Sequence, residues 1–143
     1  MPVTFRFQEI PSQVFGRIYR PVATVGFKHK TKPVWVSIEM IIDTGADYSI
    51  LPRTYADALG IDLLRDCSTH RTLGIGGTER IFLYQGQAAR LGNYARKIPI
   101  GFLDRESGPA LLGRHEFLET FKVVFVDHTT QFMNPGARER APR

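Results

Sequence analysis

A chain of 143 residues is long enough to bury one hydrophobic core but too short for two ordinary domains, so we expect a single domain. Hydrophobic residues make up 43% of the sequence and charged residues 23%, and no apolar run approaches the roughly 18 to 20 residues that a membrane-spanning helix needs. The first residues lack the pattern of a secretory signal, and the single cysteine, Cys67, cannot form an internal disulfide. We therefore expect a cytoplasmic protein with no membrane partner.

The net charge of +5 arises largely from two basic clusters, at residues 28–32 and 138–143. Basic patches are one mark of nucleic-acid binding. However, the first cluster has the polar character of a hairpin loop, and the second that of a chain end interrupted by Pro and Gly. The sequence shows no aromatic-rich basic strand and no zinc motif, and its histidines lack ligand spacing. We predict no nucleic-acid partner, no metal site and no cofactor.

The first predicted hairpin lies between Val14 and Ile42, and its two strands are joined by the Lys-rich loop. The strands are marked by alternating apolar residues: Val22, Val25 and Phe27 on the first, and Val34, Val36, Ile38 and Ile41 on the second. Residues 1–13 are interpreted as an N-terminal extension of a domain that covers residues 14–133.

Asp43 stands directly after the second of these strands and is followed at once by Thr44 and Gly45. A carboxylate at the end of a buried strand is unfavourable unless it has a function. Gly45 leaves room for the close approach of another group, and the Thr44 hydroxyl can pin the loop by hydrogen bonding. The pattern therefore indicates a carboxylate held in a fixed orientation, and we interpret Asp43 as the working group of the protein.

A short helix is predicted over residues 53–59, because Pro52 suits its first turn and Gly60 suits its end. Residues 69–89 then follow the pattern strand, glycine cluster, strand, which predicts a β-hairpin with Gly74–Gly77 at its tip. By itself the cluster is only a turn signal. Beside the aspartate motif it predicts a mobile lid whose backbone N–H groups can bind an extended peptide.

The remaining elements are predicted by the same signals. They are strands at 85–91 and 95–102 joined at Gly92-Asn93, a polar loop at 104–109, a return to the core at 110–112, an amphipathic helix at 115–121 with Phe117, Leu118 and Phe121 inward, strands at 122–127 and 129–133, and a flexible basic tail at 134–143.

Three stretches in this order resemble the retropepsin-like aspartic proteases. Residues 41–51 resemble the active-site loop, residues 73–77 resemble the glycine-rich flap tip, and residues 110–114 resemble the apolar-apolar-Gly-Arg segment beneath that loop. A lone Asp-Thr-Gly would be a weak signal, whereas three ordered motifs spanning residues 34–121 are a strong one. The resemblance implies a mainly β fold: a closed, β-barrel-like acid-protease lobe with one or two short helices and a glycine-rich flap hairpin.

The chemistry implied by the resemblance needs two carboxylates, one to activate water while the other holds the proton. The chain contains one Asp-Thr-Gly and is too short for two lobes, so the second Asp43 must come from another copy in a symmetric homodimer. Carboxylates about 3 Å apart share one proton, as in aspartic proteases generally. The resemblance thus implies an endopeptidase that takes a peptide or protein substrate and has an acidic to mildly acidic optimum.

The resemblance also implies roles around Asp43. Thr44 would interlock with its mate across the dimer axis, Gly45 would accept a hydrogen bond from the substrate backbone, and Ala46 would keep the cleft floor small. Structural support would come from Asp47, Gly113 and Arg114, with the guanidinium of Arg114 holding the Asp47 carboxylate at two points. The flap tip would comprise Gly74, Ile75, Gly76 and Gly77. The substrate pocket would include Tyr48, Ile50 and Leu111, which favours hydrophobic residues beside the cut bond.

Some features depart from the viral pattern. Tyr48 stands where a small or acidic residue is usual, which should reshape a subsite next to the cleavage site, and Leu73 leaves the flap one glycine poorer. Longer segments at both ends bear on how the protein dimerises. Two other classes stay open: a catalytically silent dimerisation or peptide-binding module with the same fold, and a nucleic-acid-binding domain supported only by charge.

Overall fold

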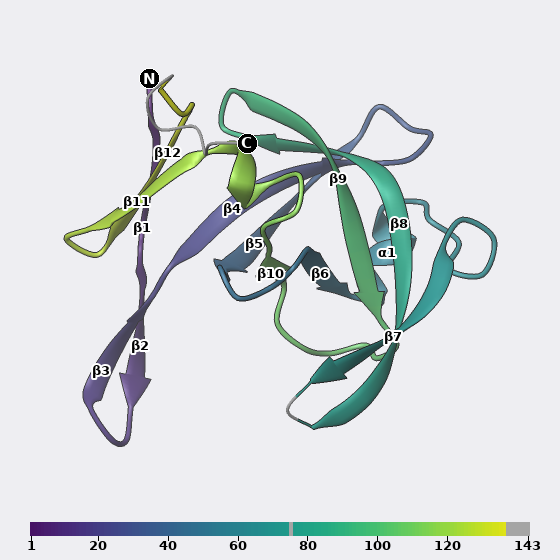
Figure 1. Cartoon of the computed structure of the whole chain (residues 1–143), viewed down its shortest axis with the longest axis horizontal. Coiled ribbons are helices and arrows are strands. Elements are labelled where there is room, and N and C mark those ends of the chain that lie inside the picture. Colours follow the sequence, from purple (N-terminus) through teal and green to yellow (C-terminus); the bar gives the residue numbers. More distant parts are fainter. Residues whose placement is uncertain (75, 137–143) are drawn as a thin grey trace.

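The computed structural model describes residues 1–74 and 76–136, which are folded mainly as β-strands (Figure 1). The strands are β1 (Val3–Arg6), β2 (Gln8–Ser12), β3 (Gly16–Arg20), β4 (Val22–Lys28), β5 (Trp35–Ile42), β6 (Ser49–Pro52), β7 (Ser68–Gly74), β8 (Gly77–Leu91), β9 (Tyr94–Leu103), β10 (Leu111–Leu112), β11 (Lys122–Val126) and β12 (Thr129–Met133). The helices are α1 (Thr54–Ala58) and the 3₁₀ helix η1 (Leu118–Thr120). The predicted mainly β fold with short helices is confirmed.

The main sheet has the strand order β4-β5-β10-β6-β9-β8-β7, and a further pairing between β4 and β8 closes it into a ring. The short strand β10 lies parallel to β5 and antiparallel to β6, so it joins the two strands on either side of the loop that contains Asp43. The β4–β5, β7–β8 and β8–β9 hairpins form where the expected strands and turn residues predict them. This arrangement brings residues 110–112 beneath the loop that follows β5.

The core fills the inside of this ring. Strand β4 buries alternate residues, as its period of two predicts, and β5 does the same along its second half. Burying a large apolar side chain contributes roughly 1.5 to 3 kcal/mol, so a small ring can be stabilised by a limited number of them. The largest fully buried side chains are Phe27, Phe102, Phe117, Phe132, Ile38, Met40, Leu51, Leu59, Ile81, Leu91, Ile98 and Ile100.

The two ends of the described chain meet in a second sheet with the order β1-β12-β11. Strands β11 and β12 form the predicted hairpin, and both residues of its turn, Asp127 and His128, have positive φ angles of 50° and 55°. Phe132 packs edge-on against Phe5 and Phe121, which joins this sheet to the end of η1. The N-terminal segment is therefore paired with the C-terminal strands.

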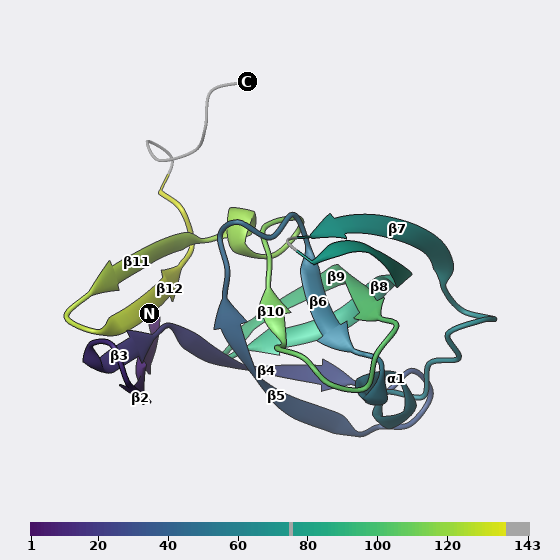
Figure 2. The ribbon, with the colours of Figure 1, turned by 90° about the horizontal axis from the view of Figure 1, so that it is seen from below.

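A separate hairpin, β2–β3, projects from the rest of the molecule (Figures 1 and 2). Within the described residues its strands pair only with each other, and its tip residues Val14 and Phe15 are 80% and 77% exposed. The sequence did not predict it, because Pro11 interrupts β2 and neither strand has a buried face. The domain boundary placed after residue 13 falls in the turn of this hairpin and stays a prediction.

Two predicted elements differ in extent. The strands expected at residues 81–84 and 85–91 are one strand, β8, with a register shift between Tyr84 and Gln87 and a positive φ of 74° at Gly86. Such a bulge lets a long strand bend around the ring. The helix expected at residues 115–121 is only η1, because Glu116 has a φ of 59°. The three residues predicted to face inward there are nevertheless buried.

Helix α1 is short and ends where the sequence predicts. Gly60 has a φ of 72°, the left-handed conformation that favours glycine after a helix. Ala56 of the helix and Leu59, the residue that caps its C-terminus, are buried in the hydrophobic core. In the part of the chain that the structure describes, none of the helices has the length and apolar character needed to cross a membrane.

Candidate active site

Asp43 directly follows β5, at the point where the chain leaves the main sheet. Its N–H donates to the carbonyl of Leu112 at 3.0 Å, which continues the β5–β10 ladder by one residue. Its carbonyl accepts from the N–H of Ala46 at 3.1 Å, and its Oδ1 accepts from the N–H of Gly45 at 2.9 Å. The turn is tight because Gly45 has no side chain to place beside the carboxylate. The loop itself therefore orients a half-buried Asp43 side chain.

Gly113 and Ser49 fix this loop from beneath. A Cβ atom on Gly113 would collide with the backbone carbonyl of Tyr48, so the two segments can pack this closely only with glycine at position 113. The Gly113 N–H donates to Oγ of Ser49 at 3.0 Å, and Ser49 is 1% exposed. Ser49 was not among the predicted site residues. Its signal is a hydroxyl inside the apolar strand β6, where burial requires a partner.

Arg114 holds the loop from the side. Its Nη2 donates to Oδ1 of Asp47 at 2.6 Å, and its Nε donates to the Ala46 carbonyl at 3.3 Å. The guanidinium thus spans a side-chain and a main-chain acceptor, whereas we expected two contacts with the carboxylate. Two main-chain hydrogen bonds connect the same segments: the N–H of Arg114 donates to the carbonyl of Ala46 at 3.0 Å, and the N–H of His115 donates to the carbonyl of Asp47 at 2.8 Å. The Asp47 and Arg114 side chains are 83% and 50% exposed, so water weakens their ion pair.

Asp43 opens onto a cavity of about 520 Å³, here called the cleft. Its volume lies in the range usual for ligand sites. The predicted pocket residues Tyr48, Ile50 and Leu111 all line it, whereas Thr44 is exposed outside the lining. The full lining is Asp43, Gly45, Ala46, Asp47, Tyr48, Ile50, Thr72, Leu73, Glu79, Leu103, Arg105, Pro109 and Leu111.

Tyr48 brings a phenol into this cleft. Burial and, to a smaller extent, the nearby Asp47 raise its pKa above the ordinary value of 10.0. The hydroxyl therefore stays neutral at acidic and neutral pH and can donate a hydrogen bond. The cleft accordingly combines one oriented carboxylate with a neutral donor and an apolar surface.

The β7–β8 hairpin forms the opposite wall. Its strands pair continuously from Ser68 and Leu83 to Gly74 and Gly77, and β7 supplies Leu73, which is 83% exposed. Gly76 and Gly77 have no atom within 4 Å of the place where a Cβ would stand. Ile75, predicted for this tip, lies outside the described residues. Figure 2 shows this hairpin on the same side of the main sheet as the loop between β5 and β6.

Charged residues join this hairpin to the loop after β9. Arg80 donates to Oδ2 of Asp104 from Nε at 2.9 Å and from Nη2 at 2.6 Å, and Arg53 Nη1 donates to Oδ1 at 3.1 Å. The hydrogen bonds from Arg80, and then those from Arg53, lower the pKa of Asp104. One residue further, Nε of Arg105 lies 3.0 Å from Oε1 of Glu79. Sequence reasoning missed these pairs, whose partners lie far apart along the chain.

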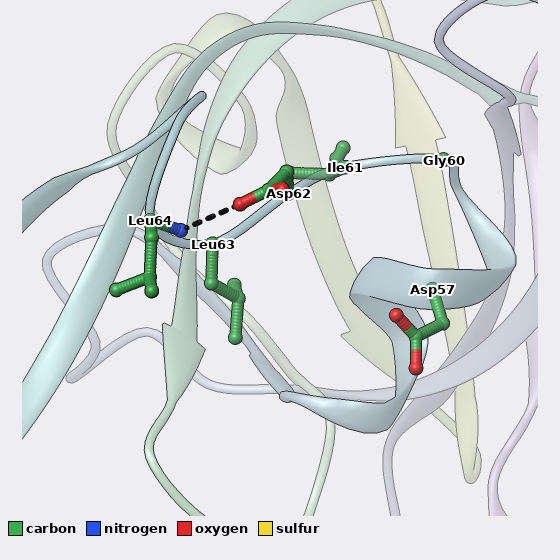
Figure 3. A pocket seen from close by; sticks show the side chains of 6 residues that line it. All are labelled: Asp57, Gly60, Ile61, Asp62, Leu63 and Leu64. Atoms are coloured by element: carbon green, nitrogen blue, oxygen red, sulfur yellow. Dashed lines mark hydrogen bonds between the residues drawn. The ribbon is translucent and has the colours of Figure 1, made fainter.

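A second hollow, of about 430 Å³, lies beside α1 and shares no lining residue with the cleft (Figure 3). Its Asp62 accepts hydrogen bonds at Oδ1 from the N–H groups of Leu64 and Arg65, both at 3.0 Å. The carboxylate therefore orders its own loop. We place no chemistry there.

Other reactive groups are poorly suited to catalysis. Burial is the main cause that raises the pKa of the Cys67 thiol, to about 11, so Cys67 is not ionised at neutral pH. Across residues 1–74 and 76–136, no three His, Cys, Asp or Glu side chains gather closely enough to hold a metal ion. Asp43 and its surroundings are thus the strongest candidate site.

Comparison with known proteins places this chain in a family. A family model described as aspartyl protease matches residues 31–115, more than half of the chain. The chain therefore belongs to the aspartyl proteases, and the predicted retropepsin-like family is confirmed.

Among solved structures, 240 chains match. One of the most similar is a retropepsin-like aspartic protease from Rickettsia conorii, with 20% identity over 92% of this chain and 98% of that chain, and a TM-score of 0.62. At this identity the match shows a shared fold. The curated proteins provide no match.

Proposed function

We propose that the protein is an aspartic endopeptidase in which the Asp43 carboxylates of two copies activate a water molecule between them. The observation that carries this proposal is the position of Asp43, held by main-chain hydrogen bonds at the floor of a cleft of about 520 Å³. The family supports the reaction class.

The second carboxylate has to come from another copy of the chain. The other acidic residues that line the cleft, Asp47 and Glu79, are both paired with arginines, at 2.6 Å and 3.0 Å. Neither is placed to share a proton with Asp43. Thr44 is exposed at the turn beside Asp43 and would meet its mate in a twofold dimer.

In the reaction, two facing Asp43 side chains share one proton because two like charges at close range do not both ionise. The ionised carboxylate takes a proton from water as it attacks the scissile carbonyl, while the protonated carboxyl hydrogen-bonds to the carbonyl oxygen. The tetrahedral intermediate then collapses as the leaving nitrogen accepts a proton from the dyad. The pH dependence belongs to the pair and not to either residue.

Substrate recognition follows from the walls of the cleft. An extended peptide would lie between the loop of Asp43 and the β7–β8 hairpin, which acts as a lid and offers main-chain groups. Side chains beside the cut bond would contact Ile50, Leu73, Leu103 and Leu111, all of which line the cleft. These contacts favour hydrophobic residues at that position.

The test compares the wild type with Asp43→Asn, which preserves shape and removes the ionisable group. An unfolded protein is offered at matched, high enzyme concentration from about pH 3.5 to 7.5, the range in which a shared proton titrates. We expect wild-type cleavage with an acidic to mildly acidic optimum and no cleavage by the variant. Asp57→Asn, an exposed carboxylate in α1, is the matched control and should retain activity.

Dilution provides an independent readout, because a site made by two chains loses activity faster than enzyme concentration falls. Cleavage by Asp43→Asn at the wild-type rate would overturn the assignment of Asp43. Absence of cleavage by a wild type shown to be a folded dimer would instead favour a peptide-binding module with this fold.

A further inference from the structure

The lid side of the cleft carries one ion pair, between Glu79 of β8 and Arg105 of the loop after β9. Nε of Arg105 lies 3.0 Å from Oε1 of Glu79, and both residues line the same cavity as Asp43. A peptide bound in the cleft would therefore meet this pair. Its charged atoms provide a polar contact beside apolar side chains such as Leu73 and Leu103, which line the same cavity.

The two partners differ in how far they can move. Glu79 is paired with Thr72 in the β7–β8 ladder, and its side chain is 32% exposed. Arg105 lies on a loop, and its long side chain is 53% exposed. Ion pairs between groups this exposed are individually weak, and Arg105 can turn toward water without disturbing a strand. Glu79 would then remain at the cleft wall without its cation.

The loop that carries Arg105 has other anchors. The carbonyl of Arg105 accepts a hydrogen bond from the N–H of Arg53 at 3.1 Å. The neighbouring Asp104 is bound by both Arg80 and Arg53. These contacts do not involve the Arg105 side chain. The backbone can therefore keep its position while the guanidinium leaves Glu79.

The charge of the lining favours a cation as the replacement. Asp43, Asp47 and Glu79 contribute three carboxylates to the cleft, against the guanidinium of Arg105 in the lining and that of Arg114, which pairs with Asp47. The chain as a whole has a net charge of +5, so this acidic lining is a local feature. Once Arg105 turns away, the potential at Glu79 attracts positive charge. A lysine or arginine stem can also pack along the apolar lining while its charged end reaches the carboxylate.

We infer that Glu79 forms a subsite for a lysine or arginine side chain of the peptide substrate, which takes the place of Arg105. This inference rests on the proposed function, because it concerns the substrate of the same cleft. It adds a basic residue to the hydrophobic residues expected beside the cut bond. Because the dimer is twofold, the preference would apply at two positions of the peptide, one on either side of the cut bond, whose side chains reach β8 of the two copies.

The test uses sets of peptides that differ at a single position, which carries Lys, Gln or Glu. Each position on either side of the cleavage site is varied in turn, and kcat/KM is measured for every peptide. For the wild type we expect one position on each side of the cleavage site at which Lys exceeds Gln by about threefold to fivefold, the ratio that a half-exposed ion pair provides. Glu79→Gln should remove this preference. Arg105→Gln should keep or increase it, because no internal cation then competes.

A charge exchange separates specificity from folding. The double variant Glu79→Arg with Arg105→Glu retains an ion pair between the two positions and reverses its direction, so the favoured residue should change from Lys to Glu. The matched control is Glu9→Gln, which removes the exposed pair of Glu9 and Arg17 at 2.9 Å in β2–β3 and should leave the preference unchanged.

Cleavage of all peptides with no position that favours Lys would overturn the inference and leave the protease assignment standing. Persistence of the preference in Glu79→Gln would overturn it as well. If the wild type cleaves none of the peptides, the proposed function fails, and binding of the same labelled peptides by fluorescence anisotropy decides the subsite. The Glu79 subsite is supported if the wild type binds the Lys peptide more tightly than the Gln peptide and Glu79→Gln does not. It is overturned if the wild type binds the two peptides equally or binds neither.

Discussion

The two walls of the cleft are held in place by different interactions. The loop of Asp43 is fixed by main-chain hydrogen bonds and by the buried Ser49 hydroxyl. The β7–β8 hairpin is joined to the loop after β9 by side-chain ion pairs, Arg80 with Asp104 and Arg105 with Glu79, whose members are partly exposed. One wall is therefore held within the core, whereas the hairpin, beyond the last β8–β9 pair at Ile81 and Leu103, is held to that loop by ion pairs at the surface.

This difference separates two needs of the proposed reaction. Carboxylates that share a proton need fixed positions, and buried hydrogen bonds between neutral groups respond little to salt or pH. A wall that must open for a peptide benefits from weaker contacts, and exposed ion pairs are screened by salt. Changing each wall in turn tests whether stability and substrate binding separate as this comparison predicts.

The largest effect is expected for Gly113→Ala. Its new methyl group would meet the backbone of Tyr48, which cannot turn away as a flexible side chain could. We expect a loss of about 3 kcal/mol or more in the free energy of unfolding, near the upper end for overpacking, together with loss of proteolysis. Urea unfolding measures the first. Gly26→Ala is the control, since its nearest neighbour would lie at an ordinary 3.5 Å, and equal stability of the two variants would contradict the prediction.

A smaller effect on the same wall is expected for Ser49→Ala. The variant leaves the buried N–H of Gly113 without its acceptor, which costs about 1 to 3 kcal/mol of unfolding free energy. Denaturant titration provides the value. The control is Ser68→Ala, where the hydroxyl bonds to His70 at an exposed position and its loss should change stability by about 0.5 kcal/mol or less. A Ser49→Ala variant as stable as this control would show that the loop is held without the hydroxyl.

Local signals were sufficient to predict much of the fold. The β4–β5 hairpin has apolar residues on both sides of a polar turn, β11 is a continuous apolar run before a turn, and α1 is followed by Gly60. The β2–β3 hairpin gives no comparable signal. Both of its faces are at least partly exposed, so neither strand needs a row of apolar residues. The bulge in β8 and the shortness of η1 depend on single residues, Gly86 and Glu116, whose positive φ angles the sequence pattern does not reveal.

The residues of the candidate site also divide into those that local sequence signals identify and those that they do not. Tyr48, Ile50 and Leu111 could be placed near Asp43 because they belong to the motifs themselves, and they line the cleft with it. Ser49 and Asp104 could not be identified, since their roles arise from contacts between distant segments. The pairing of Glu79 with Arg105 likewise depends on where β8 and β9 stop running side by side, at Ile81 and Leu103. Such register is a property of the folded sheet.

The smallest effect on stability is expected for Asp104→Asn, in the loop that binds Arg80 of the β7–β8 hairpin. A separate effect on substrate binding is expected for the same variant. Arg80 and then Arg53 lower the pKa of Asp104 below its ordinary 3.8, so its carboxylate stabilises the fold above that pH. This contribution is lost as the pH falls through the lower value of the folded state. Thermal melting from about pH 2 to 6 should show this acid-dependent loss in the wild type and a smaller one in Asp104→Asn.

Asp66→Asn is the matched control, because hydrogen bonding to Lys30 also lowers the pKa of Asp66, at a position outside the cleft lining. Both variants should flatten the acid limb of the melting curve. Only Asp104→Asn should raise KM, by about threefold with little change in kcat, since a loosened hairpin weakens peptide binding while Asp43 keeps its position. Added salt should raise the wild-type KM toward that of Asp104→Asn, because it screens the same ion pairs. An equal KM for both variants would show that the ion pairs stabilise the fold without controlling the wall.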